Sequence, residues 1–488
     1  MSTVVSSPDH HQAIAALRAA LGPEHVHTSL PMRHVYSRDR LPFATFALRE
    51  GRRPGSLPCF IACPGTHDEV AAAMAITRQA NIATVPYGAG SGVLGGAIPL
   101  GDEMVLDLKR LNRIIDINAI DRTVRVQAGM NGGQFEAELN ARGYTCGHYP
   151  QSIHMSTVGG WAACRGAGQA SSRYGKIEDI VVGLRAVLPD GSTLDVRPVA
   201  RRAVGPGIKD LLVGSEGVLG VITEVTLRLW KLPEAESPLV MAFGDLGKAL
   251  QAVRDVVQAE LRPTVVRVYD PEESGQRTVG IAEFAQRPVM VMMLFTGSAR
   301  LVATEQAMTE EICLAAGAVR APEAPYLHWR KGRFDSYSPE WQAKGYFMDT
   351  VEITLPWSAL PQAYEEMRRR VFAVSPDAYF GVHWSHVYPE GACQYMTIRL
   401  PPGDTAVQLA LHRRLWDALE SHCLAVGGSI SHHHGVGAFR NAWMAQELNR
   451  GLDMLQALKD AMDPGNLLNP GKLGLRGTPA AVVLGGAA

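Results

Sequence analysis

Three consecutive histidines, His432, His433 and His434, stand in the glycine-rich segment 427–437. Imidazole titrates near neutral pH, so histidines in a site suit acid–base catalysis. A solvated cluster is one alternative and a metal site is another. An extended strand would point His432 and His434 to one face and His433 to the other, so the three can share a metal only if the backbone bends. No HExxH motif or cysteine ligand set accompanies them, although His386 is available as a further ligand. We therefore favour acid–base chemistry and assign no metal ligands.

A tyrosine and two arginines are the other candidates for chemistry. Residues 391–400 alternate as a strand does, with Met396, Ile398 and Leu400 on one face and Tyr395, Thr397 and Arg399 on the other. A tyrosine on the polar face of a core strand can face a cavity, and a surface position is the alternative.

Arg267 interrupts the otherwise apolar strand 265–269, and Arg333 follows Arg330 in segment 329–335. The arginine fork binds carboxylate or phosphate through paired hydrogen bonds. A surface or ion-paired role is the alternative for each arginine.

Three clusters of small residues form a second group of candidates: the loop 87–96, then segment 156–161, then segment 214–223. Successive glycines let backbone N–H groups approach a pyrophosphate closely. The first cluster is not a GxGxxG motif that opens a helix, and no GK[ST] motif is present, so neither a Rossmann site nor a P-loop is supported. Together the clusters indicate backbone that wraps a long, phosphate-containing cofactor.

Regular elements must position these residues. Cys59–Cys63 is expected to be a strand, and Thr66 with Glu69 matches a capping box that opens a helix over 70–80. A strand at 83–86 leads into the first glycine cluster, and residues 183–196 predict a hairpin. The alternation up to Leu229 predicts a half-buried strand. Further on, helices are predicted at 247–260, 300–316 and 404–424, and strands at 264–269, 288–295, 348–354 and 393–400.

Composition limits the class of protein. A chain of 488 residues with 46% hydrophobic residues exceeds one ordinary core, so several domains are expected. The formal net charge of −1 gives no support for a nucleic-acid partner. Seven scattered cysteines do not form a disulfide framework. We find neither a signal peptide nor an integral membrane segment, and expect a cytoplasmic homodimer acting on a small molecule.

Several of these segments together resemble the FAD-contacting core of the vanillyl-alcohol-oxidase/PCMH flavoprotein superfamily. The resemblance rests on segments 143–152, 156–161, 165–168 and 174–179. Within the superfamily, these segments and the histidine segment 427–437 are similar to the alkyldihydroxyacetonephosphate synthase family. The D-lactate dehydrogenases and glycolate oxidases carry a related histidine-glycine motif.

The resemblance implies an α+β fold with a two-subdomain PCMH-type FAD-binding domain and an α+β substrate (cap) domain with an antiparallel sheet. The corresponding division is an N-terminal helical extension (1–54), the FAD domain (55–235), the cap domain (236–450) and a C-terminal segment (451–488) that returns to the FAD domain.

The resemblance also implies the cofactor residues. FAD is expected to be non-covalent, because the pyrophosphate loop has no histidine or cysteine. The pyrophosphate would lie on Pro86, Gly88, Ala89, Gly90 and Ser91. The flavin and ribityl chain would be lined by Pro150, Ser152, Thr157, Gly159, Gly160, Gly168, Tyr174 and Gly175. Near the adenine end would lie Glu216, Gly217 and Ile222.

For the reaction, the resemblance assigns proton transfer to the histidine triplet and Tyr395, and anion binding to Arg267 and Arg333, with Arg330 as the alternative to Arg333. We favour an FAD-dependent oxidoreductase acting on a hydroxylated, acidic small molecule at the flavin N5. The alternative is exchange of an acyl for an alkyl group through an N5 adduct without net redox, as in the synthase family. A flavin-binding subunit without catalysis is a third interpretation.

Overall fold

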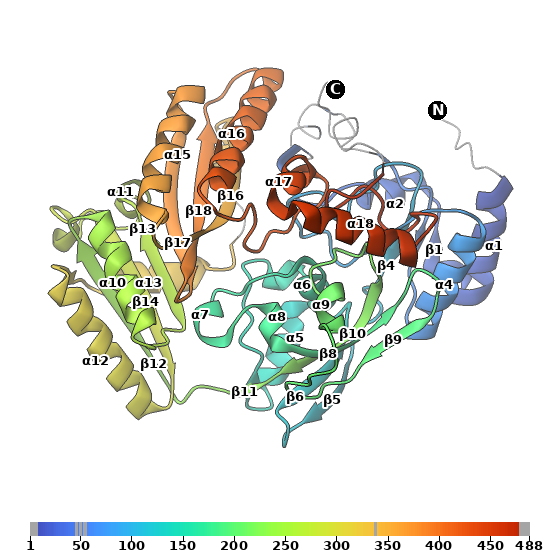
Figure 1. The fold of residues 1–488 in the computed structure, drawn as a ribbon, viewed down its shortest axis with the longest axis horizontal. Helices are drawn as coiled ribbons and strands as arrows, with labels where there is room; N and C mark the ends of the chain where they lie inside the picture. The colour runs from blue at the N-terminus through green and yellow to red at the C-terminus, as the bar shows by residue number, and fades with distance from the viewer. Residues whose placement is uncertain (1–7, 44–46, 48–50, 52–55, 336–338, 478–488) are drawn as a thin grey trace.

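The computed structural model describes residues 8–43, 47, 51, 56–335 and 339–477. Figure 1 shows two lobes, one with the seven-stranded sheet and its helices and the other with three smaller sheets. We call the part with the smaller sheets the first lobe and the part with the seven-stranded sheet the second lobe. The α+β class expected from the sequence is confirmed. The proposed N-terminal and C-terminal segments, 1–54 and 451–488, lie partly outside the described residues.

The first lobe begins with a four-stranded sheet of order β1-β2-β4-β3, in which β2, β4 and β3 are parallel. Its strands are β1 (Val26–His27), β2 (Ile61–Ala62), β3 (Thr84–Tyr87) and β4 (Met104–Asp107). The predicted helix is α4 (His67–Gln79), which Thr66 caps by accepting from the Glu69 N–H. Glu69 accepts from Gly65 rather than from Thr66, so the predicted box is only half formed. Helices α1 (Pro8–Leu21) and α4 contribute to the core cluster on this sheet.

A five-stranded antiparallel sheet of order β5-β6-β10-β8-β9 follows. Its strands are β5 (Ile114–Asn118), β6 (Thr123–Gln127), β8 (Val181–Val187), β9 (Thr193–Val196) and β10 (Val221–Arg228). The predicted hairpin is the β8/β9 pair. The half-buried prediction for β10 is wrong, since all but its last residue are buried. The strand is central and has neighbours on both edges, and both of its faces are covered.

Short helices and a small sheet complete the first lobe. The two-stranded sheet pairs β7 (Tyr144–Thr145) with β11 (Trp230–Lys231). The helices are α2 (Leu30–Val35), α5 (Gly132–Asn140), α6 (Val158–Cys164), α7 (Ser171–Tyr174), α8 (Ile177–Ile180) and α9 (Ile208–Leu212).

The second lobe is built on a seven-stranded antiparallel sheet of order β15-β12-β14-β13-β17-β18-β16. Its strands are β12 (Ala235–Phe243), β13 (Val265–Tyr269), β14 (Val289–Gly297), β15 (Val319–Arg320), β16 (Phe347–Pro356), β17 (Tyr379–Val387) and β18 (Gly391–Leu400). Its helices are α10 (Leu246–Gln258), α11 (Pro271–Gly275), α12 (Ala299–Ala315), α13 (Ala324–Gly332), α14 (Pro339–Ala343), α15 (Leu360–Val374) and α16 (Thr405–Ala425).

One face of this sheet forms the largest core cluster, with residues of α10, α12, α15 and α16. Met396, Ile398 and Leu400 of β18 belong to it, as the alternation predicts. The opposite face has two parts. Under β12, β13 and β14 it is apolar and packs on Tyr326 of α13. Under β16, β17 and β18 it carries the polar residues of the candidate site.

The chain returns to the first lobe through α17 (Met444–Leu448) and α18 (Arg450–Met462), which Figure 1 shows lying across it. Lys459 donates to the carbonyl of Val218, and Leu468 forms a parallel bridge with Thr84 beside β3. In the part of the chain that is described, no helix combines the length and apolar character needed to cross a membrane.

Candidate functional site

The histidine segment is folded around one buried carboxylate. Glu352 of β16 accepts hydrogen bonds from the backbone N–H groups of His432 (2.6 Å), His433 (3.3 Å) and His434 (3.0 Å). Ser431 Oγ donates to the same carboxylate at 3.1 Å. The backbone therefore bends at the triplet instead of running extended, and the three rings radiate from a common anchor.

An arginine balances the charge of this carboxylate. Arg440 Nη1 lies 2.9 Å from Glu352 Oε1, and Arg440 Nε lies 3.0 Å from Glu420 Oε1, with all three side chains fully buried. Burial alone would raise the pKa of Glu352, but Arg440 and the histidines hold it at about 2. Burial raises the pKa of Glu420 to about 8. Glu352 is thus an ionised anchor at neutral pH.

A kink in β17 brings a fourth histidine to the triplet. His386 has a φ of 53°, at the register shift between Ser385 and Val387. Such a bulge turns a side chain away from its regular direction. The His386 ring lies 4.9 Å from each of the His432 and His433 rings. Its Nδ1 lies 2.8 Å from Ser171 Oγ, on the first lobe.

Tyr395 lies beside the triplet, on the same side of the second-lobe sheet. Its ring stacks on His383 at 4.8 Å and on His433 at 6.1 Å, and meets His434 edge-on at 5.6 Å. Its hydroxyl donates to Thr350 Oγ1 at 3.0 Å. Burial raises the pKa of Tyr395 to about 12, so the phenol is protonated at neutral pH.

Of the predicted arginines, Arg267 lies nearer this group. Its Nη2 lies 2.8 Å from His383 Nε2, and its Nε donates to Tyr269 Oη at 2.7 Å. His383 in turn stacks on Tyr395, so the arginine is joined to the tyrosine through one imidazole ring.

Arg333 lies between the lobes, with its guanidinium 5.4 Å from the centre of the Tyr149 ring. Its backbone carbonyl accepts from Gln169 of the first lobe. Arg330, the alternative, instead pairs with Glu236 at 2.9 Å on the exposed surface. The arrangement favours Arg333 over Arg330.

The buried histidines are neutral at neutral pH. Burial and the nearby Lys176 lower the pKa of His432 to about 3. Burial together with neighbouring imidazoles lowers the pKa of His433 well below its usual range, and burial with His432 does the same for His386. A lowered pKa weakens an imidazole as a base, so proton uptake by His433 requires a nearby negative charge, and Glu352 lies 3.6 Å from its Nδ1.

The first glycine cluster is a loop of free donors. Among the described residues, the backbone N–H groups of Ala89, Gly90, Ser91 and Gly92 meet no acceptor. Ala89, Gly90 and Ser91 are half-buried, and N–H groups at such positions are normally paired, so three in a row indicate a missing acceptor. Gly88 packs on Thr157, where an added Cβ would lie 2.5 Å from Thr157 Oγ1, and Gly217 packs on Pro86. The three predicted clusters therefore do meet.

The middle segment contributes an unpaired histidine. His148 is fully buried, and neither ring nitrogen has a hydrogen-bond partner within the described chain. Gly168 fits only as glycine, because an added Cβ would be 2.4 Å from the Tyr149 nitrogen. Gly159 and Gly160 lie in α6, which Thr157 caps, while Pro150 and Ser152 precede it.

Three predicted cofactor residues make contacts that the sequence analysis did not anticipate. Tyr174 packs its ring on Trp230 at 4.9 Å, and the following Gly175 has a φ of 84°. Ile222 is buried in the core of the five-stranded sheet. Glu216 accepts from the N–H groups of Val436 (2.6 Å) and Gly437 (2.8 Å), directly after the histidines. Glu216 thus joins the cofactor lobe to the histidine segment.

With this geometry established, comparison with known proteins becomes informative. Residues 58–197 match the model of the FAD binding domain, and residues 232–473 match that of the C-terminal domain of FAD-linked oxidases. The chain therefore carries both the FAD binding domain and the C-terminal domain of FAD-linked oxidases. FAD is its cofactor.

Curated relatives of this chain include a synthase and two FAD-linked oxidoreductases. Alkyldihydroxyacetonephosphate synthase of Dictyostelium discoideum is 29% identical over 85% of this chain and 73% of its own length. The uncharacterized FAD-linked oxidoreductase YgcU of Escherichia coli strain K12 is 28% identical over 94% of this chain and 97% of its own. Glycolate oxidase subunit GlcD of Bacillus subtilis is 26% identical over 93% and 94%, respectively.

Solved structures with the same fold include a synthase and a hydroxylase. An alkyldihydroxyacetonephosphate synthase superposes with a TM-score of 0.79 at 22% identity, over 96% of this chain and 86% of its own. A p-cresol methylhydroxylase superposes with a TM-score of 0.76 at 15% identity, over 97% and 98%.

The observed donors fit FAD. Its pyrophosphate is an anion that can accept from the free N–H groups of residues 89–92, and its ring system carries polar atoms that can meet His148. The unpaired donors are therefore compatible with the cofactor residues predicted from the sequence.

One group near the triplet has the composition of a metal site: Glu352, Cys393, His432 and His433 each offer an atom within 4.8 Å of the others. Its carboxylate already accepts three backbone N–H groups and pairs with Arg440. We therefore keep the prediction that assigns no metal here.

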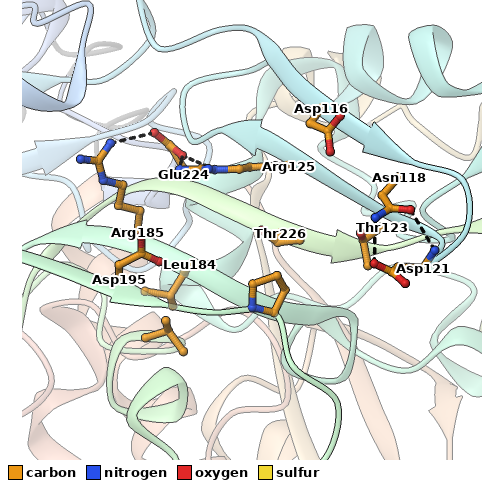
Figure 2. A pocket seen from close by; sticks show the side chains of 12 residues that line it. Asp116, Asn118, Asp121, Thr123, Arg125, Leu184, Arg185, Asp195, Glu224 and Thr226 are labelled. Carbon is orange, nitrogen blue, oxygen red and sulfur yellow. Dashed lines mark hydrogen bonds and ion pairs between the residues drawn. The ribbon is translucent and has the colours of Figure 1, made fainter.

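A pocket of about 190 Å³ opens elsewhere, on the outer side of the five-stranded sheet (Figure 2). Figure 2 shows Glu224 between Arg125 and Arg185, an ion-pair ladder across three strands. Neither the glycine clusters nor the histidines line this pocket. We assign it no part in the chemistry.

Sequence reasoning missed several residues that organise the site. Glu352, Arg440 and Tyr388 were not singled out, although Tyr388 Oη lies 2.9 Å from His432 Nε2. A usable signal existed for Glu352, a lone charge between Val351 and Ile353 in an apolar strand. Such a charge is seldom buried without a partner.

Proposed function

We propose that this flavoprotein is an oxidoreductase that oxidises a hydroxylated, acidic small molecule. The observation that carries the proposal is the group of neutral histidines beside Tyr395 and Arg267, on the polar face of the second-lobe sheet. A base and an anion-binding arginine side by side are what the oxidation of a 2-hydroxy acid requires.

In this proposal each residue has one task. Arg267, with Arg333 as a second cation, binds the substrate carboxylate. His433 accepts the proton of the substrate hydroxyl. The rings of His432 and His434 pack beside the His433 ring and fix its position. Tyr395 donates a hydrogen bond to the same oxygen, because its raised pKa keeps it protonated. FAD, when bound, supplies the two-electron acceptor.

The cofactor residues are proposed as in the sequence analysis, with FAD held non-covalently. Their support is the meeting of the three glycine clusters around unpaired donors. The division at residues 54, 235 and 450, the homodimer and the cytoplasmic location are also proposals. Light scattering on the purified protein and fractionation of cells would check the last two.

The alternative is a synthase-like exchange of an acyl for an alkyl group without net redox. The similarity to alkyldihydroxyacetonephosphate synthases favours it. The face of β18 beyond Tyr395 argues against it, because Thr397 and Arg399 are polar and offer little to a fatty chain.

An anaerobic absorbance titration of the FAD-loaded protein separates the two. We expect D-2-hydroxy acids to bleach the flavin fully, by two electrons. Bleaching only by an acylated dihydroxyacetone phosphate, reversed by a fatty alcohol, would instead establish the exchange reaction.

A further inference from the structure

The polar face of the second-lobe sheet continues beyond Tyr395. The antiparallel register sets Tyr395 opposite Glu352 on β16 and His383 on β17. Two residues further on, Thr397 is opposite Thr350 and Gly381, and the row ends at Arg399, opposite Met348 and Tyr379. Because facing residues in register share a side of the sheet, these rows form one strip that starts at the histidines. We call it the β18 strip.

Arg399 at the end of the strip is held in an aromatic sandwich. Its guanidinium carbon lies 4.0 Å from the centre of the Tyr379 ring and 4.3 Å from that of Trp341 in α14. Arginine stacks on aromatic faces in this way. With both faces covered, the guanidinium can form hydrogen bonds only through N–H groups in its own plane.

Those N–H groups lack partners. Arg399 is 8% exposed, and its Nε and Nη1 are buried with no hydrogen-bond partner within the described residues. Nη2 reaches Gln276 Oε1 only at 3.5 Å. Leaving such groups unpaired is costly, and more so on a charged side chain.

Of the described carboxylates, Glu340 interacts electrostatically with this cation, but it is exposed and forms its ion pair with Lys344. Arg399 takes part in no ion pair within the described chain, and Glu273, beside Tyr379, is paired with Arg277. An oxyanion with two oxygens in one plane is the ligand that an arginine fork matches. Within the described residues, the guanidinium fork is therefore open to an external anion.

We propose that Arg399 binds a second, distal anionic group of the substrate, so that the substrate is an elongated dianion. This inference rests on the proposed function. One end is the 2-hydroxy acid beside Tyr395 and His433, and the other is a terminal carboxylate or phosphate at Arg399. Residues 395 and 399 lie roughly 13 Å apart along the strand, so several carbons separate the two charges. The short side chains of Thr350 and Thr397 leave the strip low over β16 and β18, whereas the Tyr379 hydroxyl and the Glu273 side chain cover Gly381 on β17.

The test compares matched ligands on the FAD-loaded protein by anaerobic calorimetric titration. One pair is 2-oxodecanedioate against 2-oxodecanoate, which differ in the distal carboxylate and cannot reduce flavin. The other is 6-phosphogluconate against gluconate, which differ in the distal phosphate. We expect wild-type protein to prefer the dianion of at least one pair by about tenfold or more. The preferred pair identifies the distal group.

Substitution assigns the preference to its residue. Arg399→Gln should remove it while FAD and the melting temperature are retained. Arg399→Lys, which keeps the charge without the fork, should retain part of it. Arg368→Gln is the matched control, because Arg368 also stacks on an aromatic ring, Phe372, but lies in α15 on the helical side. If Arg399→Gln fails to hold FAD, the lysine variant alone decides, and an unchanged preference there counts against the proposal.

The proposal is overturned if wild-type protein shows no preference in either pair, or if the preference survives in Arg399→Gln. Its failure differs from failure of the proposed function. If hydroxy acids do not reduce the flavin but 2-oxodecanedioate binds through Arg399, the reaction is wrong and the distal site stands.

Discussion

At the scale of single residues, the site is a set of neutral histidines gathered by an ionised carboxylate. Glu352 accepts from the backbone N–H groups of the triplet, and its oxygens also lie 3.6 Å from His433 Nδ1 and 3.7 Å from His434 Nδ1. His432 Nδ1 and His433 Nδ1 are 2.9 Å apart, so one of them must carry the proton between them. Proton transfer within the triplet is therefore built into the geometry.

Replacing His433 with alanine tests its role as the base. We expect turnover to fall by about 100-fold or more, the usual contribution of a general base, while FAD remains bound. Steady-state kinetics and the flavin absorption spectrum measure the two effects. His328→Ala, an exposed histidine of α13, is the control. Full activity in His433→Ala would eliminate the acid–base assignment.

Replacing Glu352 with glutamine tests the anchor. The amide keeps the shape but leaves Arg440 with less compensation in a fully buried position. Removing one partner of a buried ion pair costs about 3–5 kcal/mol, so we expect a loss of this order in the free energy of unfolding. Urea denaturation measures it. Glu340→Gln, in an exposed pair with Lys344, should leave stability unchanged. An equal effect in both variants would contradict the anchoring role.

At the scale of elements, the glycine loop that we propose as the pyrophosphate site is in close contact with α6. Thr157 caps α6 through its Oγ1, and the same oxygen touches Gly88 of the loop after β3. If the loop moved away from α6, its unpaired N–H groups would no longer keep their present arrangement. The N-terminus of α6 thus fixes the position of the N–H groups that we propose as pyrophosphate donors.

A methyl group at residue 88 should disturb this contact. Gly88→Ala places a Cβ 2.5 Å from Thr157 Oγ1, so we expect FAD affinity to fall by at least about tenfold. Flavin fluorescence during titration of the apoprotein measures it. Adding Thr157→Ala removes the obstructing oxygen and should restore part of the affinity. A double variant as weak as Gly88→Ala would show that the contact is not the cause.

Local pattern predicted the elements with strong periodicity and missed those without it. The capped helix α4, the β8/β9 hairpin and β18 follow from caps, turns and alternation. Strand β17 was missed because its polar residues, among them His383 and His386, face the site and break the apolar pattern. The apolar strand β12 was missed as well, although it pairs with both β14 and β15.

The same limit applies to the site. The histidine triplet and glycine clusters stand out locally, because their residues are adjacent in the chain. Glu352 and Arg440 do not, since each acquires its role only when β16 and the segment after the triplet are brought together. Glu216 was predicted near the adenine end, and its hydrogen bonds to Val436 and Gly437 depend on the same long-range folding.

At the scale of the whole molecule, the burial of histidines couples stability to pH. Burial lowers the pKa of His148 to about 3 and that of His383 well below its usual range, as it does for His386, His432 and His433. In the unfolded chain these side chains take up protons below about pH 6.5. The folded protein does not, so the unfolded state binds more protons in that range.

Stability should therefore fall as the pH is lowered from about 6.5 toward 3. Each such group contributes up to about 1.4 kcal/mol per pH unit to the slope. Urea denaturation between pH 7.5 and 5.5 measures the slope. His148→Gln should reduce it by up to one group's share. Equal slopes in the variant and the wild type would show that His148 is not held neutral.

The return of the chain to β3 also bears on synthesis. Asn469 donates to the carbonyl of Gly96, 373 residues earlier, and Lys472 to that of Ile98, 374 residues earlier. The glycine loop thus leaves the ribosome long before Asn469 and Lys472, the residues that donate hydrogen bonds to its C-terminal end. We expect nascent chains to emerge as apoprotein and to capture flavin only once residue 472 has been translated.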